Sequence, residues 1–209
     1  NTAFGKDALE LNTSGVNTAV GGNALAAVTT GTSNTAVGQD ALTANTASRN
    51  TAVGAYALDA NTTGDNNTAV GENAGTATTT GHNNTFIGQD AGEANLTGDY
   101  NVAVGSDALD AASSADYNVA VGASALSAVT TGTNNVAVGT DAGASATTVD
   151  NNTAIGHFAL QDNTAASNTA VGASALLQNS TGSEGVAVGK NALATNTTGV
   201  RNVAVGVEA

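Results

Sequence analysis

The residues that could do acid–base chemistry are few and scattered along the chain. The two histidines, His82 and His157, lie in variable stretches, and neither has a nucleophile or acid beside it in a set that recurs. Acidic pairs such as Asp107 and Asp110 recur loosely around turn-forming residues. Catalysis needs such groups to converge in a pocket. We therefore expect the histidines to be exposed turn residues and the protein not to be an enzyme.

Aspartates at a common position of an internal repeat are the remaining candidates for ligand chemistry. They are Asp7, Asp40, Asp90, Asp107 and Asp141. A hard cation such as Ca²⁺ takes six or more oxygen ligands, whereas isolated Asp side chains are explained equally well by the capping of turns. The absence of cysteine excludes thiolate metal sites. We expect no cofactor, with a structural calcium ion as the alternative that these carboxylates leave open.

Composition and charge narrow the classes of partner. The chain has 17 acidic and 4 basic residues, which give a net charge of -13. Binding to phosphates requires clustered Lys and Arg, so nucleic acid is not an expected partner. The same charge disfavours anionic membrane surfaces. No apolar run is long enough to cross a bilayer, and we expect no membrane insertion.

An internal repeat organises the whole chain. The unit Asn-[Thr/Val]-Ala-[Val/Ile]-Gly occurs in thirteen near-copies, and its glycines follow one another at intervals of 16 or 17 residues. A fixed period of this length indicates a solenoid. The chain contains no Cys, Met, Trp or Pro and few aromatic residues. Such a composition fills only a thin core, as in proteins whose repeats each pack on the next.

The positions within the repeat predict its local structure. With Asn as position 1, position 3 is Ala except at Phe86, position 5 is always Gly, and position 9 is Leu in nine of twelve copies. We expect a strand over positions 1 to 5, a second short strand over positions 8 to 11, and turns between them. The predicted fold is all-β: one domain over residues 1–209, a parallel β-roll (a β-solenoid) of about thirteen rungs of 16–17 residues.

Alternation along the first strand places positions 2 and 4 on one face and positions 1, 3 and 5 on the other. A β-branched row suits a packed interior. We therefore expect position 4 to form the core of the coil, at Val37, Val53, Val70, Ile87, Val104, Val121, Val138 and Ile155.

The opposite face carries mostly Asn, Ala and Gly, which allow close approach of another chain. We expect it to meet the partners in a threefold bundle, with Phe86 as a hydrophobic plug near the axis. The residues assigned to this interface are Asn67, Ala19, Ala36, Ala52, Ala69, Phe86, Ala103, Ala120, Ala137, Ala154 and Ala170.

The repeat also resembles known families. Asn-Thr-Ala-Val-Gly-x-x-Ala-Leu, followed by Asn-Thr-Thr-Gly, resembles the repeats of phage tail-fibre proteins. Val102-Ala103-Val104-Gly105 and Val119-Ala120-Val121-Gly122 are similar to the head repeats of trimeric autotransporter adhesins of the YadA type. The resemblance covers the whole chain. It implies a left-handed parallel β-roll, three chains per fibre, and a role as a rod or an adhesive surface.

We therefore expect a non-enzymatic structural or adhesive segment of a trimeric extracellular fibre, either a phage tail fibre or a surface adhesin. Its location would be the virion tail or the bacterial cell surface. The expected partners are two further copies of the chain and a host-cell surface receptor or glycan. The chain begins and ends within the repeat, so we expect it to be part of a longer fibre protein.

Two other functions fit a solenoid. An ice-binding β-solenoid would use a regular row of Thr, and the rows available are positions 2 and 13. Position 2 mixes Thr with Val, for example at Val102 and Val119, which is what an inward-facing row tolerates. A self-assembling extracellular filament would use the unpaired strand edges at the two ends of the roll.

Overall fold

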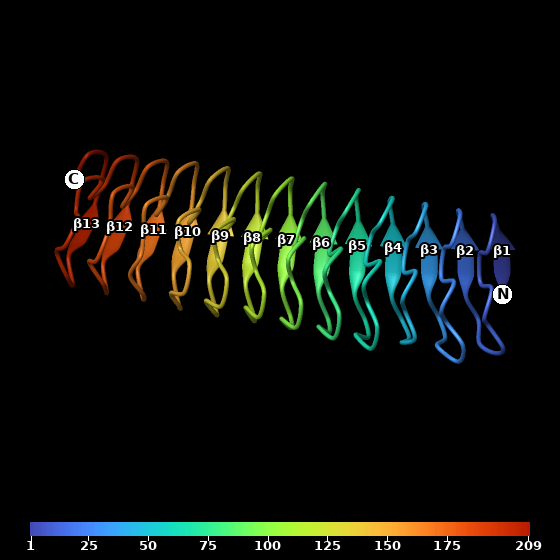
Figure 1. Cartoon of the computed structure of the whole chain (residues 1–209). Helices are drawn as coiled ribbons and strands as arrows, with labels where there is room; N and C mark the ends of the chain where they lie inside the picture. Colours follow the sequence, from blue (N-terminus) through green and yellow to red (C-terminus); the bar gives the residue numbers. More distant parts are fainter.

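The computed structural model describes all residues 1–209 and contains strands but no helix. Each repeat contributes one three-residue strand at positions 2 to 4. The strands lie side by side in a single row, with the two chain termini at opposite ends (Figure 1). Their bounds are β1 Thr2–Phe4, β2 Thr18–Val20, β3 Thr35–Val37, β4 Thr51–Val53, β5 Thr68–Val70, β6 Thr85–Ile87, β7 Val102–Val104, β8 Val119–Val121, β9 Val136–Val138, β10 Thr153–Ile155, β11 Thr169–Val171, β12 Val186–Val188 and β13 Val203–Val205.

The thirteen strands form one parallel sheet in sequence order, β1 to β13. Equivalent positions pair across neighbouring strands, so that Ala52 pairs with Ala69 and Ala69 with Phe86. Each strand is followed by a full turn of chain before the next begins. Backbone hydrogen bonds also join neighbouring rungs outside the sheet, as from Leu25 N–H to the Ala41 carbonyl at 3.1 Å. The predicted parallel β-solenoid is confirmed.

The expected second strand over positions 8 to 11 is absent. This segment is a series of turns, in which positions 7 and 9 adopt a left-handed backbone conformation; φ is +53° at Leu25 and +51° at Leu58. An extended strand cannot curve tightly enough to close so short a coil. Residues with positive φ reverse the local bend while each rung still bonds to the next. The prediction failed because the apolar pattern at positions 8 and 9 reports burial and not backbone conformation.

The interior of the coil is lined by positions 1, 3, 8, 9, 12 and 15. The assigned strand faces are therefore reversed. The position 4 row expected in the core lies on the outside, half-buried or exposed, at Val37, Val53, Val70, Ile87, Val104, Val121, Val138 and Ile155. The row expected to meet partner chains lies inside the coil, where each side chain is at most 2% exposed: Asn67, Ala19, Ala36, Ala52, Ala69, Phe86, Ala103, Ala120, Ala137, Ala154 and Ala170.

The physical reason for this reversal is the opposite wall of the coil. That wall carries Ala at position 8 and Leu at position 9, and leucines such as Leu25, Leu42 and Leu58 are fully buried. They already fill the narrow interior, so the facing strand has room only for Ala. A row of Val and Ile at the same place would overpack the core.

A buried asparagine ladder runs along the strand wall at position 1. The Asn67 side-chain oxygen accepts a hydrogen bond from the backbone N–H of Asn84 at 2.9 Å, and the Asn67 amide donates to the Gly81 carbonyl at 2.7 Å. The same bond between consecutive rungs recurs from Asn17 to Gly185. The buried carboxamide of Asn67 thus has partners for both its donor and its acceptor, which keeps it compatible with burial. Asn152 is an exception, because its amide nitrogen is buried without a partner in the protein.

Phe86 fills the space that two missing leucines leave. It is completely buried, and a Cβ built on Gly75 would lie only 2.6 Å from its ring. A Cβ on Gly92 would also overlap the ring. Both glycines stand at position 9, where most rungs have Leu. The plug expected between three chains is therefore a plug inside one chain, and the absence of Leu on these two rungs leaves room for the large ring.

Candidate functional site: the outer sheet face

The strand residues at positions 2 and 4 form a continuous outer surface, which we call the outer sheet face: the first and third residues of β1 to β13. It contains only Thr, Val and Ile, with Phe4 at one end, and no charged residue. Exposure at position 4 reaches 37–40% at Val53, Val70, Ile87, Val138, Ile155 and Val188. The net charge of -13 is therefore carried by the other surfaces of the solenoid.

The outer sheet face is regular because every strand has the same length and register. Twelve steps of about 4.8 Å give a length of roughly 58 Å, and three residues give a width of about 10 Å. The face therefore covers on the order of 600 Å². The face mixes an apolar row at position 4 with a position 2 row that is mostly Thr, and a long uncharged strip of this kind is a candidate interaction surface. A standard protein interface takes about 800 Å² per partner, so this face would supply most of one.

The side chains of this face favour contact with another flat surface. β-Branched residues have restricted χ1 angles and lose little freedom when they are covered. The chain has no pocket that could enclose a small molecule. What this face offers is a long, rigid and uncharged strip of methyl groups and hydroxyls.

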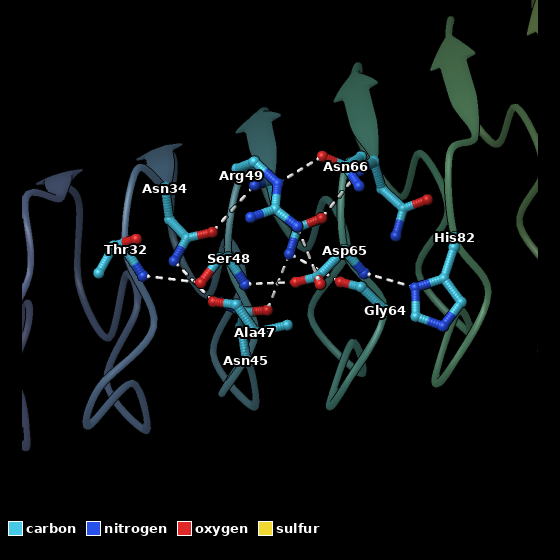
Figure 2. Close-up of polar contacts among 12 residues, drawn as sticks. Thr32, Asn34, Asn45, Ala47, Ser48, Arg49, Gly64, Asp65, Asn66 and His82 are labelled. Carbon is cyan, nitrogen blue, oxygen red and sulfur yellow. Dashed lines mark hydrogen bonds and ion pairs between the residues drawn. The ribbon is translucent and has the colours of Figure 1, made fainter.

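The histidine with the most partners has a structural role. His82 is one of a row of side chains at position 16 of the rungs. Ser48 N–H donates to Asp65 Oδ1 at 2.7 Å, and Asp65 N–H donates to His82 Nδ1 at 2.9 Å (Figure 2). His82 N–H in turn donates to Asp99 Oδ1 at 2.6 Å. The side chains of Ser48, Asp65, His82 and Asp99 each accept a backbone hydrogen bond from the preceding rung, so these groups hold neighbouring turns together.

The second histidine and the acidic residues are also dispersed. His157 lies against Phe158, with ring centroids 3.6 Å apart. Asp7 forms an exposed ion pair with Lys6 at 3.1 Å. Asn23 donates to Asp40 at 2.7 Å, and Asn73 to Asp90 at 2.9 Å, so aspartates at position 7 bond from rung to rung.

No group of three or more His, Cys, Asp or Glu side chains is arranged to hold a metal ion. The fold also has no helix that could span a bilayer.

Two aspartates at position 10, Asp59 and Asp110, are in an environment that disfavours their charged form. Burial raises the pKa of Asp110, and the neighbouring carboxylates of Asp107 and Glu93 add to the effect. Burial likewise raises the pKa of Asp59, with a further contribution from Asp40. Asp110 Oδ1 is buried and receives no hydrogen bond from the protein. These shifts follow from crowding at a turn, because no pocket or substrate-sized hollow adjoins either residue.

Sequence reasoning did not single out the outer sheet face as a candidate binding surface. The signal that could have found it is the pairing of Phe86 with Gly75 and Gly92. A large residue at position 3 coincides with glycine at position 9, so the side chains at these two positions must fill the same interior space. Position 4, on the other face of the strand, must then lie outside. No family model, no curated protein and no solved structure matches the chain.

Proposed function

We propose that this chain is a non-enzymatic structural segment of a trimeric extracellular fibre, in which three outer sheet faces meet around a common axis. The observation that carries the proposal is the uncharged strip, which is continuous over thirteen strands and β-branched throughout except at Phe4. Covering it removes apolar surface from water. The resemblance of the repeat to tail-fibre and adhesin-head repeats supports the same assignment, with a location on a virion tail or a bacterial surface.

The shape of the molecule suits this role. A solenoid in which every rung bonds to its neighbours is a stiff rod, and its length grows by one strand spacing per repeat. The charged residues lie outside the proposed interface, so three chains of charge -13 can associate without burying a charge. The remaining repulsion between the chains is screened at physiological ionic strength.

Solution mass tests the proposal directly. We expect the protein at 0.15 M salt to have about three times the chain mass of 19.9 kDa. The variant Val70→Glu/Val121→Glu places charges in the proposed interface and should be monomeric with an unchanged circular dichroism spectrum. The matched control is Thr63→Glu/Thr131→Glu, which adds the same charges at exposed turn positions and should stay trimeric. A wild-type mass of one chain at all concentrations would refute the trimer.

Ice binding is the second candidate, and one observation favours it. Position 2 faces outward, so its Thr residues, such as Thr51 and Thr68, belong to the flat outer sheet face and not to the core. A flat array of hydroxyls and methyls at a fixed spacing can order water.

Thermal hysteresis separates this candidate from the fibre. A monomeric wild type that depresses the freezing point, and loses the effect in Thr51→Lys/Thr68→Lys, would favour ice binding. A trimer without thermal hysteresis would favour the fibre.

A further inference from the structure

Two tyrosines form an exposed aromatic pair on one corner of the solenoid. Tyr100 and Tyr117 are the last residues of consecutive rungs and are 50% and 56% exposed. Their rings are parallel within 3°, with centroids 5.1 Å apart. Parallel rings in contact are separated by only about 3.5–4.0 Å, so the two rings must be offset sideways. The offset leaves part of each aromatic face uncovered.

The backbone holds this pair in place. Both residues have a left-handed conformation with φ of +57°. Each is followed directly by a buried residue of the asparagine ladder, Asn101 or Asn118, which is bonded to the neighbouring rungs. A ligand would therefore meet a surface that is already ordered, which lowers the entropy lost on binding.

A fixed carboxylate stands before each tyrosine. Asp99 Oδ1 accepts from His82 N–H at 2.6 Å, and Asp116 Oδ1 accepts from Asp99 N–H at 2.8 Å. These bonds orient both carboxylates through one oxygen and leave Oδ2 of each without a donor from the protein. Two oriented acceptors therefore stand one rung apart beside the aromatic pair.

The surroundings of the pair select the chemistry of its ligand. No Lys or Arg occurs between Arg49 and Lys190, so anionic sugars and nucleic acid would meet only negative charge. The corner positions on the adjoining rungs are Asn83 and Asn134, whose amides supply donors as well as acceptors. A surface that combines aromatic faces, carboxylate acceptors and amide donors suits a neutral polyhydroxylated ligand.

We propose that Tyr100 and Tyr117, with Asp99 and Asp116, form a binding site for a neutral β-linked glycan that lies along the solenoid axis. The sugar rings pack on the uncovered aromatic faces, and their hydroxyls donate to the free carboxylate oxygens. Successive sugars of an extended β-1,4-linked chain follow one another at nearly the spacing of successive rungs, so one chain can reach both tyrosines, with alternate sugars presenting opposite edges to the carboxylates. The site lies beside the outer sheet face and does not depend on the trimer.

Intrinsic fluorescence gives a direct readout, because the chain has no Trp and only three Tyr. In the Tyr56→Phe variant all tyrosine emission comes from the proposed site. We expect titration with cellohexaose or chitohexaose to give a saturable change in emission. By calorimetry, Tyr100→Ala/Tyr117→Ala should weaken binding by roughly tenfold or more. Tyr56→Ala is the matched control and should bind as wild type.

Asp99→Asn/Asp116→Asn tests the carboxylates without removing their structural bond, because an Asn oxygen can still accept from the backbone. We expect weaker binding and an unchanged circular dichroism spectrum. The proposal is overturned if neither hexasaccharide binds wild type saturably, or if both double variants bind as wild type. Salt-sensitive binding of a hexalysine peptide at the tyrosines, without sugar binding, would assign the site to a basic partner instead. Because mass is measured separately, a monomer that binds sugar refutes only the fibre.

Discussion

Phe86 and the two glycines that face it, Gly75 and Gly92, show how a large side chain on one wall of the narrow interior requires a small one on the other. On most rungs Ala at position 3 faces Leu at position 9, and here Phe faces Gly. Gly75 and Gly92 have φ of +62° and +61°, close to the values of Leu at the same position. The backbone of these rungs therefore already has the conformation that the usual Leu adopts.

A set of substitutions tests this exchange. Phe86→Ala should destabilise the fold by about 3–5 kcal/mol, because it leaves a cavity. Gly75→Leu/Gly92→Leu should also destabilise it, since the new side chains overlap the ring. Combining all three substitutions should recover most of the loss by restoring the ordinary packing. Chemical denaturation of wild type, Phe86→Ala, the double glycine variant and the triple variant gives the free energy of unfolding of each. If the changes in this free energy are additive, the side chains at positions 86, 75 and 92 do not occupy the same space.

A second buried row at position 12 contains a gap in its hydrogen bonding. Asn61 donates to Asn45 Oδ1 at 2.7 Å, but Asn61 Oδ1 has no protein donor, because the next rung carries the shorter Thr78. Thr78→Asn should close the gap and raise stability by about 1 kcal/mol. For a chain of this size the melting temperature should rise by roughly 2–4 °C, as measured by calorimetry.

The control for this prediction is Ala112→Asn, at the same position two rungs later. Where position 12 is Asn in a 17-residue rung, position 15 is Gly, and a Cβ on Gly64 would lie 2.5 Å from Asn61 Oδ1. The rung of Ala112 has Ala115 at position 15, whose Cβ takes that space. Ala112→Asn should therefore lower the melting temperature. A rise in this variant together with a fall in Thr78→Asn would refute the proposed ladder.

At the scale of elements, the residues with left-handed backbone conformations lie in the turn segment of each rung, whereas the strands all have the same length and register. Left-handed residues at positions 7 and 9 bring the backbone around within six residues. They also bring position 10 side chains of neighbouring rungs close together, as Glu93 and Asp110 are, while Asp107 lies at position 7 of the same rung as Asp110. The contribution of this turn segment to the stability of the fold should therefore depend on pH.

Asp110→Asn should stabilise the protein near neutral pH and have little effect in acid. The folded-state pKa of Asp110 is raised above the ordinary 3.8 by burial and by adjacent carboxylates. Its protonated form is favoured by folding, so its contribution is fully present below pH 3.8 and is lost as the pH rises through the raised pKa. Thermal melts from pH 3 to pH 7 should show the two proteins diverging with rising pH. A constant difference would contradict this linkage.

At the scale of the whole molecule, each rung contacts only the rung before and the rung after it. Stability in such a protein is a sum over rungs and their interfaces. The asparagine ladder and the outer sheet face are both continuous only while every rung has equivalent positions in register.

Deletion of one complete rung should therefore be tolerated. Removal of residues 118–134 joins Tyr117 to Asn135 and places position 1 of one rung directly after the last position of another. We expect a folded protein with an unchanged shape of the circular dichroism spectrum and the same number of chains per assembly. Deletion of residues 118–127 is the control, since it leaves only part of one rung and puts the neighbouring rungs out of register. The asparagine ladder and the backbone hydrogen bonds between rungs are then interrupted at that point. Equal loss of structure in both variants would show that rungs are not independent units.

The sequence by itself determined the period, the position of the one strand that each rung forms, the parallel stacking and the asparagine row, because each follows from a repeat of side-chain types. It also predicted a second strand over positions 8 to 11, which the structure replaces with turns. It did not determine which face of the strand is inside. Alternation separates Val70 from Ala69 but is symmetrical between in and out, and a shift of one residue exchanges every side chain. Tertiary structure decided this through the leucines at position 9, which lie on the opposite wall and fill the interior. The small Ala row is therefore buried, and the larger Val row remains outside as a surface that another molecule can cover.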